Sequence, residues 1–164
     1  MKRWVIADTH FGHVNVIKYG NRPFNTINEM DEALIKNWNN TISKDDVVYM
    51  LGDFTLSRNR EYIKSIVERL NGRITLVMGN HDTLKPHQYI KLGFWTAIKK
   101  PILVDPRVVL MHRPPRDEDI MPGMTYIFGH IHNKVIEIEE KSNCICVSVE
   151  RTDYKPVNLD KILK

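Results

Sequence analysis

Five apolar runs in this chain end in side chains that can bind a metal ion or transfer a proton. The most concentrated example is Gly79-Asn80-His81-Asp82, which follows the run from Ile74 to Met78. A β-branched run that ends abruptly in such residues is typical of a strand that delivers polar groups to the edge of a sheet. The other four runs end at Asp8 and His10, at Asp53, at His112, and at His130 and His132.

Together these side chains predict a metal site. In an open α/β sheet, ligands bind beyond the carboxyl ends of the strands, where loops from separate strands converge. Imidazole and carboxylate without thiolate suit Mn, Fe, Zn or Co better than Mg or Ca. Extended backbone places both members of the pairs Asp8/His10 and His130/His132 on one side, where they can hold one ion or two adjacent ions. A carboxylate such as Asp53 can bridge two cations. Any one pair alone is more typical of a turn, and only the ordered series indicates a site.

The first half of the chain must position these groups with alternating strands and helices. We expect strands over 3–7, 46–51 and 73–78. The helical spacing of apolar residues predicts amphipathic helices over 30–42 and 62–70, and a short helix over 83–92 tolerates Pro86 in its first turn. Glycine precedes Asp53, Asn80 and His130, which permits the close backbone approach that such a site needs.

The second half has a different pattern, with short strand-like runs at 95–98, 102–104, 107–111, 125–128, 134–138 and 143–149. Partial alternation over 135–139 is typical of a sheet with one solvated face. We therefore expect α/β layering in front and an antiparallel second sheet behind. Cys144 and Cys146 lie two apart in the last run, and we expect two buried strand thiols rather than a disulfide, with a Cys-x-Cys metal site as the alternative.

Length and composition limit the classes of protein to consider. The 164 residues contain no linker-like shift in composition, so we expect one domain over residues 1–164. A net charge of +4 is compatible with an anionic substrate such as a phosphate ester or nucleic acid. No apolar run approaches the ~20 residues of a membrane span. The first apolar run ends at Asp8, too early for a signal peptide, and we expect a cytoplasmic protein.

The ordered motifs carry a family resemblance. Asp8-x-His10, Gly52-Asp53, Gly79-Asn80-His81-Asp82, His112 and Gly129-His130-x-His132 resemble the full signature of the calcineurin-like metallophosphoesterase superfamily. The segments His10-Phe11-Gly12-His13 and Asn21-Arg22-Pro23-Phe24 resemble a small bacterial and phage branch of it. The resemblance implies an α/β fold, a four-layer α-β-β-α sandwich of two mixed β-sheets flanked by helices, in a single domain without a cap domain.

The resemblance also implies a role for each motif residue. One metal ion would be held by Asp8, His10, Asp53 and His132, and the second by Asp53, Asn80, His112 and His130. Two such ions share a hydroxide that attacks phosphorus in an in-line displacement. His81 would stabilise the transition state or protonate the leaving oxygen. Asp82 would orient His81 as a supporting carboxylate.

The implied activity is metal-dependent hydrolysis of a phosphoric ester. A phosphodiester is the expected substrate, because the chain is compact and lacks a cap domain. The alternatives are a phosphomonoesterase acting on nucleotides or phosphoproteins, and a non-catalytic scaffold with the same fold, against which the filled ligand positions argue.

The expected cofactor is two divalent transition-metal ions, with Mn first and Fe, Zn, Ni or Co as alternatives. Nucleotides and cyclic nucleotides are candidate substrates; no membrane and no dedicated nucleic-acid-binding module are expected, and an oligomer is left open. Candidate phosphate contacts are His13, Arg22 and Arg113.

Overall fold

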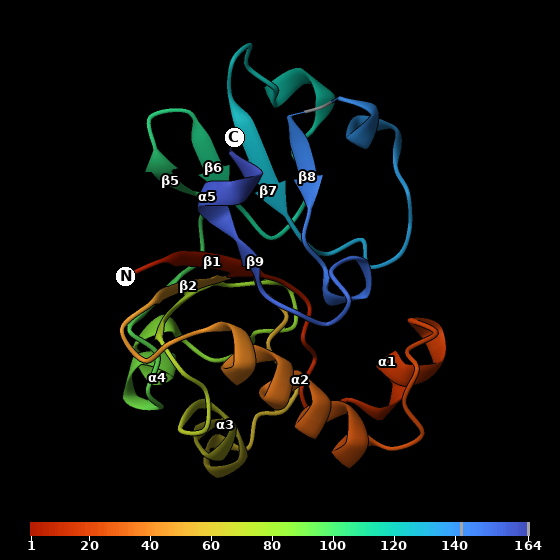
Figure 1. Ribbon diagram of the computed structural model, residues 1–164, viewed down its shortest axis with the longest axis vertical. Helices are drawn as coiled ribbons and strands as arrows, with labels where there is room; N and C mark the ends of the chain where they lie inside the picture. Colours follow the sequence, from red (N-terminus) through yellow and green to blue (C-terminus); the bar gives the residue numbers. More distant parts are fainter. Residues whose placement is uncertain (142, 164) are drawn as a thin grey trace.

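A computed structural model describes residues 1–141 and 143–163 of the chain, which form two mixed β-sheets (Figure 1). The five-stranded sheet has the order β4-β3-β2-β1-β9. Strands β1 to β4 are parallel, and β9 runs antiparallel to β1. These strands are β1 (Arg3–Ile6), β2 (Val47–Met50), β3 (Arg73–Val77), β4 (Thr96–Ile98) and β9 (Val157–Asn158).

The four-stranded sheet has the order β5-β6-β7-β8. Strand β5 pairs antiparallel with β6, whereas β6, β7 and β8 are parallel to one another. These strands are β5 (Ile102–Asp105), β6 (Val108–Leu110), β7 (Thr125–Phe128) and β8 (Cys144–Cys146). Each sheet therefore contains both kinds of pairing.

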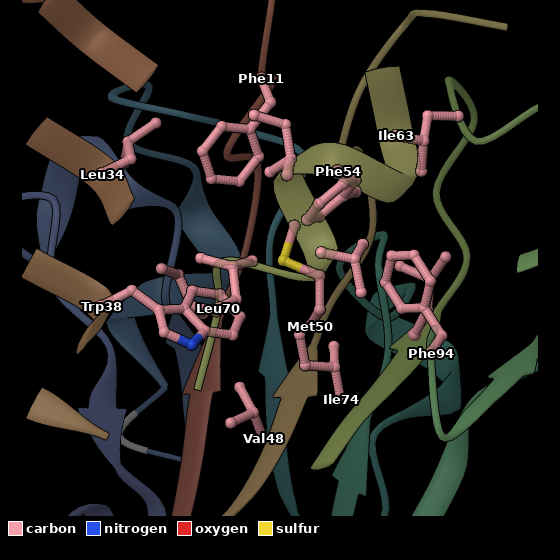
Figure 2. Packing of buried hydrophobic residues seen from close by; sticks show 14 of the residues in the cluster. Phe11, Leu34, Trp38, Val48, Met50, Phe54, Ile63, Leu70, Ile74 and Phe94 are labelled. Carbon is pink, nitrogen blue, oxygen red and sulfur yellow. The ribbon is translucent and has the colours of Figure 1, made fainter. Parts of the chain in front are cut away.

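Helices α2, α3 and α4 lie on the outer side of the five-stranded sheet, in the lower half of Figure 1, and α1 lies beside them at the right. Thr26 caps the longest of them, α2, by accepting a hydrogen bond from the Glu29 backbone N–H. Trp38 of α2 belongs to the main hydrophobic core together with Met50 and Phe54 (Figure 2). The helices are α1 (Val14–Tyr19), α2 (Ile27–Thr41), α3 (Arg60–Val67) and α4 (Pro86–Lys91).

Alternation along β1 fills two cores with one strand. Ile6 packs toward the helices, whereas Val5 and Ala7 belong to a second cluster with Leu110 and Ile127 of the other sheet. This second cluster packs between the two sheets, and residues of α5 (Leu159–Ile162) pack against it. The far side of the four-stranded sheet carries a third cluster, bordered by the 3₁₀ helices η1 (Asp117–Asp119) and η2 (Glu137–Glu140); a further 3₁₀ helix, η3 (Val149–Arg151), follows β8.

The predicted α/β class, with two mixed sheets flanked by helices, is confirmed, and so is the β-α-β-α-β order of the first half. The predicted antiparallel second sheet is wrong, because the long connections through η1 and η2 return the chain for parallel pairing. The predicted strand over 134–138 is wrong as well. Ile136 and Ile138 instead pack the η2 segment against the third cluster. The alternation of apolar and polar residues here therefore comes from a loop with one buried side.

Two smaller expectations also have an outcome. Cys144 and Cys146 are free thiols in β8, as predicted. Cys144 is buried, but Cys146 is only partly buried, so the expectation of two buried thiols is confirmed for Cys144 alone. Strand β9 and helices α1 and α5 were not predicted from sequence. Within the described ranges, no helix combines the length and apolar character that crossing a bilayer requires.

Candidate metal centre

Strand ends from both sheets converge on one cluster of carboxylates and imidazoles. Because β1, β2 and β3 are parallel and in register, the loops that follow them leave the same edge of the sheet. The loops after β6 and β7 reach this edge from the second sheet. Two groups of candidate ligands result, Asp8 with His10 and His132, and Asp53 with His112 and His130, and within each group the ligand atoms lie within 4.8 Å of one another.

Asp53 lies between the two groups. Its Oδ2 is 3.5 Å from His112 Nε2 in its own group and 3.7 Å from His10 Nε2 in the other. Its Oδ1 accepts a hydrogen bond from the His81 backbone N–H at 2.9 Å, which leaves Oδ2 facing both groups. A carboxylate in this position can contact a cation on either side.

Buried atoms without a partner show whether this cluster suits a metal ion. Asp8 Oδ1 and both ring nitrogens of His10 are buried and lack any hydrogen-bond partner within the described part of the chain. Asp8 Oδ2, in contrast, accepts hydrogen bonds from His130 N at 2.8 Å and Ser148 Oγ at 2.6 Å. An unsatisfied buried polar group costs about 1–3 kcal/mol, and a metal ion would supply the missing partner. The residues present therefore fit a bound divalent cation.

The second ligand group also fits a divalent cation, because several of its lone pairs point to one place. His112 Nδ1 lies 2.8 Å from the Leu51 carbonyl oxygen, which can only accept, so Nδ1 carries the proton. Burial lowers the pKa of His112, so the ring is neutral and Nε2 has a free lone pair. That nitrogen lies 3.0 Å from Asn80 Oδ1 and 3.5 Å from Asp53 Oδ2. Three lone-pair donors converge there, and a cation would bring them together without repulsion.

The other imidazoles predicted as ligands differ in what sets their protonation. Burial strongly lowers the pKa of His10. Burial, with the neighbouring His112 imidazole and the Arg113 charge, lowers the pKa of His130 to about 4, so both rings are neutral near pH 7. Burial also acts to lower the pKa of His132, but the hydrogen bond and charge of Glu150 outweigh it and raise that pKa. The His132 Nδ1–H donates to Glu150 Oε1 at 2.8 Å, which leaves Nε2 for a metal.

A buried arginine fixes Glu150 in turn. Arg22 donates from Nε at 2.9 Å and from Nη2 at 2.7 Å to Glu150 Oε1. It also donates to the carbonyl oxygens of Asp8 at 2.7 Å and Thr9 at 2.8 Å. Its side chain is 0% exposed. The expectation that Arg22 contacts the substrate phosphate is therefore corrected: its donors are engaged inside the protein, where they hold the Asp8 loop and Glu150.

The ligand loops use an unusual backbone conformation. A positive φ costs a residue with a side chain of order 1–3 kcal/mol, and such residues cluster at functional sites. The strain here must be offset by hydrogen bonds to the same loops, of which the Arg22 bonds are one set. Five of the seven predicted ligands have φ between 51° and 72°, namely Asp8, His10, Asp53, His130 and His132.

Asp82 supplies the second set of loop hydrogen bonds. Its buried carboxylate accepts from the backbone N–H groups of Asp53 at 2.7 Å, Phe54 at 3.0 Å and Gly79 at 2.8 Å. The expected Asp82–His81 contact is absent from the hydrogen bonds among residues 1–141 and 143–163, so Asp82 organises the backbone rather than orienting His81. Position 79 requires glycine, because a Cβ there would overlap Asp53 Oδ1.

Three predicted residues lie at the rim of the cluster. The His81 side chain is 43% exposed, and its Nε2 is 4.0 Å from Asp53 Oδ2. The ring centroid of His13 lies 5.6 Å from that of His10, and its Nδ1 lies 3.4 Å from the Tyr19 hydroxyl. Arg113 is exposed and follows His112. Each is therefore placed where an entering molecule could contact it.

Sequence reasoning missed Glu150 and Ser148, which support His132 and Asp8. The signal that identified Asp8 and Asp53 also exists here, because Glu150 directly follows the apolar run that ends at Val149. Treating the last run like the earlier ones would have singled out this acid.

Comparisons with known proteins place this geometry in context. A family model described as calcineurin-like phosphoesterase matches residues 1–105. An uncharacterised protein of Methanocaldococcus jannaschii is 39% identical, over 99% of this chain and 90% of its own length. A solved structure of a protein of unknown function from Aquifex aeolicus has a TM-score of 0.76 at 27% identity, covering 98% of this chain and 97% of that one. A nuclease from Pseudomonas putida shares the fold, with a TM-score of 0.55 at 20% identity, over 79% of this chain and 61% of the nuclease.

Proposed function

Because this chain belongs to the calcineurin-like phosphoesterase family, we propose that it hydrolyses phosphodiesters at a centre of two divalent metal ions. The family and the two carboxylate–imidazole groups make the protein a metal-dependent phosphoesterase. The diester preference, the number of ions and their identity are the steps that we add.

One observation carries the proposal. Two separate groups of ligand atoms face the same carboxylate oxygen, Asp53 Oδ2. On one side of it lie buried atoms of Asp8 and His10 that have no hydrogen-bond partner among residues 1–141 and 143–163. In the proposed centre the first ion is held by Asp8, His10, Asp53 and His132. The second is held by Asp53, Asn80, His112 and His130. Mn²⁺ is the proposed ion, since the donor set combines imidazole nitrogen with carboxylate and amide oxygen.

Bound metal ions would supply Lewis acidity, which polarises a phosphoryl oxygen and makes water a nucleophile near neutral pH. The chain itself supplies the remaining functions. His81 combines a half-exposed ring with a fixed backbone beside Asp53, and we assign it to the leaving oxygen, as a proton donor or hydrogen-bond donor. His13 and Arg113, at the rim, are proposed to orient the phosphoryl group.

The diester preference rests on access. Asn80, His81 and Arg113 leave the proposed second ion open to solvent on one side, and we propose a single domain without a cap over it. An ester with substituents on both sides of phosphorus can enter such an open site.

The test compares bis(4-nitrophenyl) phosphate with 4-nitrophenyl phosphate, in protein stripped by chelation and reloaded with Mn²⁺, Co²⁺ or Ni²⁺. Oligonucleotides join the panel, because a neighbour with this fold is described as a nuclease. We expect no activity after chelation, recovery with metal, and faster cleavage of the diester. Faster cleavage of the monoester would make the protein a phosphomonoesterase. Metal-loaded protein that is inert on every ester would favour the scaffold alternative.

Asp53→Ala tests the metal assignment separately. Because Asp53 faces both ligand groups, we expect elemental analysis to find neither ion in this variant. Retention of one ion would show that Asp53 does not bridge.

A further inference from the structure

We propose that a basic cavity beside the second ligand group holds a second phosphate of the substrate, neighbouring the phosphodiester that is cleaved. This inference rests on the proposed function and adds to it a preference for esters that carry more than one phosphate. The cavity, named here the lysine cavity, has a volume of about 310 Å³. Its polar lining includes Asn80, Lys99, Lys100, His112 and Arg113.

Strand register explains why two lysines lie next to the metal ligands. Val77 at the end of β3 pairs with Ile98 at the end of β4. The Met78 backbone N–H then donates to the Ile98 carbonyl oxygen at 2.8 Å, so the two strands leave the sheet together. Lys99 and Lys100 therefore run alongside Met78 and Gly79, directly before Asn80. The lysine cavity is continuous with the proposed second metal site, because Asn80 and His112 belong to both.

The charges in this cavity suit an anion. Lys99, Lys100 and Arg113 contribute three positive charges, and its lining contains no acidic residue. Among the residues that the structure describes, none of the three forms an ion pair with an acidic side chain. Cations without internal partners attract and orient phosphate groups at a short distance.

A second cavity provides a contrast within the same molecule. It measures about 570 Å³, lies between η1 and η2, and is lined by Asp117, Glu137 and Glu140 together with Lys141. Its negative charge would repel a phosphate, and none of its lining residues is a candidate metal ligand. Size alone therefore does not identify the phosphate site, whereas charge and continuity with the metal centre do.

The remaining walls of the lysine cavity are apolar, formed by Val77, Met78, Pro101 and Met111. Small-molecule sites commonly combine such walls with a few convergent polar groups, in volumes of about 300 Å³ or more. The cavity has room for a phosphate and part of the sugar attached to it. The ligand class is thus a phosphodiester chain, with a charged phosphate at the lysines and a less polar unit against the methionines.

The kinetic test uses three dinucleotides: TpT, and the same compound with an added 5′-phosphate or 3′-phosphate. With Mn²⁺ present, we expect one phosphorylated form to be cleaved with kcat/KM about three- to tenfold above that of TpT, the range for one or two exposed ion pairs. The double variant Lys99→Ser/Lys100→Ser should remove this preference and leave cleavage of TpT unchanged. Lys36→Ser/Lys44→Ser removes the same charge from exposed positions elsewhere and should keep the preference. A preference that is missing in wild type, or that survives in Lys99→Ser/Lys100→Ser, overturns the proposal.

A binding test does not depend on catalysis. Metal-free wild type and both double variants are titrated with a fluorescent eight-nucleotide oligothymidylate at several salt concentrations. For single strands, log affinity falls as log salt rises, with a slope of magnitude about 0.7 for each phosphate contact. We expect Lys99→Ser/Lys100→Ser to reduce the slope by about 0.7 or more, and the control variant to match wild type. An equal slope in all three proteins overturns the lysine cavity as a phosphate site. Protein that cleaves no ester yet shows the slope change refutes the proposed activity instead.

Discussion

The substitution Glu150→Gln probes the support of the metal centre without touching a proposed ligand. Glutamine keeps the shape of the side chain and an oxygen that can accept from His132 and Arg22, but it removes the negative charge. His132 would lose the carboxylate that fixes its Nδ1–H and makes its other nitrogen more basic. Changes of such supporting partners commonly reduce metal affinity by about 10–100-fold, and we expect this loss for the first ion.

The same substitution should also destabilise the metal-free protein. Arg22 is buried and pairs with Glu150 at 2.7 Å, so the change leaves its charge without a counterion. Breaking a buried ion pair costs about 3–5 kcal/mol. We expect the lower end of that range in the free energy of unfolding, because the amide oxygen retains hydrogen bonds.

Two measurements check this reasoning. Competition with a chromophoric chelator gives the affinity for Mn²⁺, and urea unfolding of metal-free protein gives the stability. Glu68→Gln is the matched control, since Glu68 forms an exposed pair with Lys64 and should change stability by less than about 0.5 kcal/mol. If Glu150→Gln binds metal with wild-type affinity and unfolds like the control, the Glu150 network does not support the site.

Three further results are expected. His81→Ala should keep both ions by elemental analysis while kcat falls about 10²–10⁴-fold; loss of an ion would make His81 a ligand. Asp82→Ala should lower the free energy of unfolding by about 3 kcal/mol in urea, because three backbone N–H groups lose their acceptor, and a loss below about 1 kcal/mol would contradict this role. Burial raises the pKa of Asp8 to about 7, and Glu150 raises the pKa of His132 against the effect of burial. Protons must therefore leave as the proposed first ion binds, and its affinity should rise as the pH increases through about 7. Calorimetry in buffers of different ionisation enthalpy measures this proton release, and pH-independent affinity would contradict it.

The apolar runs that end in polar side chains predicted the location of the candidate site, because the end of a strand depends on local sequence. Each run that ended at an acid, amide or imidazole became a strand or a strand end in the structure, and the parallel register of β1, β2 and β3 brought those ends together. The antiparallel second sheet was wrong because the direction of a strand depends on its connections. The apolar runs of β6 and β7 do not indicate whether the two strands pair in parallel or antiparallel.

The partners of buried charged residues could not be predicted in the same way. Arg22, in a loop rich in polar residues, looked like a candidate for phosphate, and only the folded chain brings it to Glu150, 128 positions away. Asp82 follows His81 directly, which suggested a contact between them, but its carboxylate turns to the Asp53 loop instead. Adjacency in sequence does not determine where a short side chain points after a tight turn.

The loops of the proposed metal centre are supported by hydrogen bonds within the chain itself. Arg22 bonds the carbonyl oxygens of Asp8 and Thr9, and Asp82 bonds the backbone N–H groups of Asp53 and Phe54. These bonds act on backbone groups that no metal ion would contact, so they can hold the positive-φ conformations in the metal-free protein. A site held in this way needs little rearrangement when a charged ligand binds. The strain at the proposed metal ligands is therefore offset by the folded chain, and the free energy of binding an ion there would remain available for affinity.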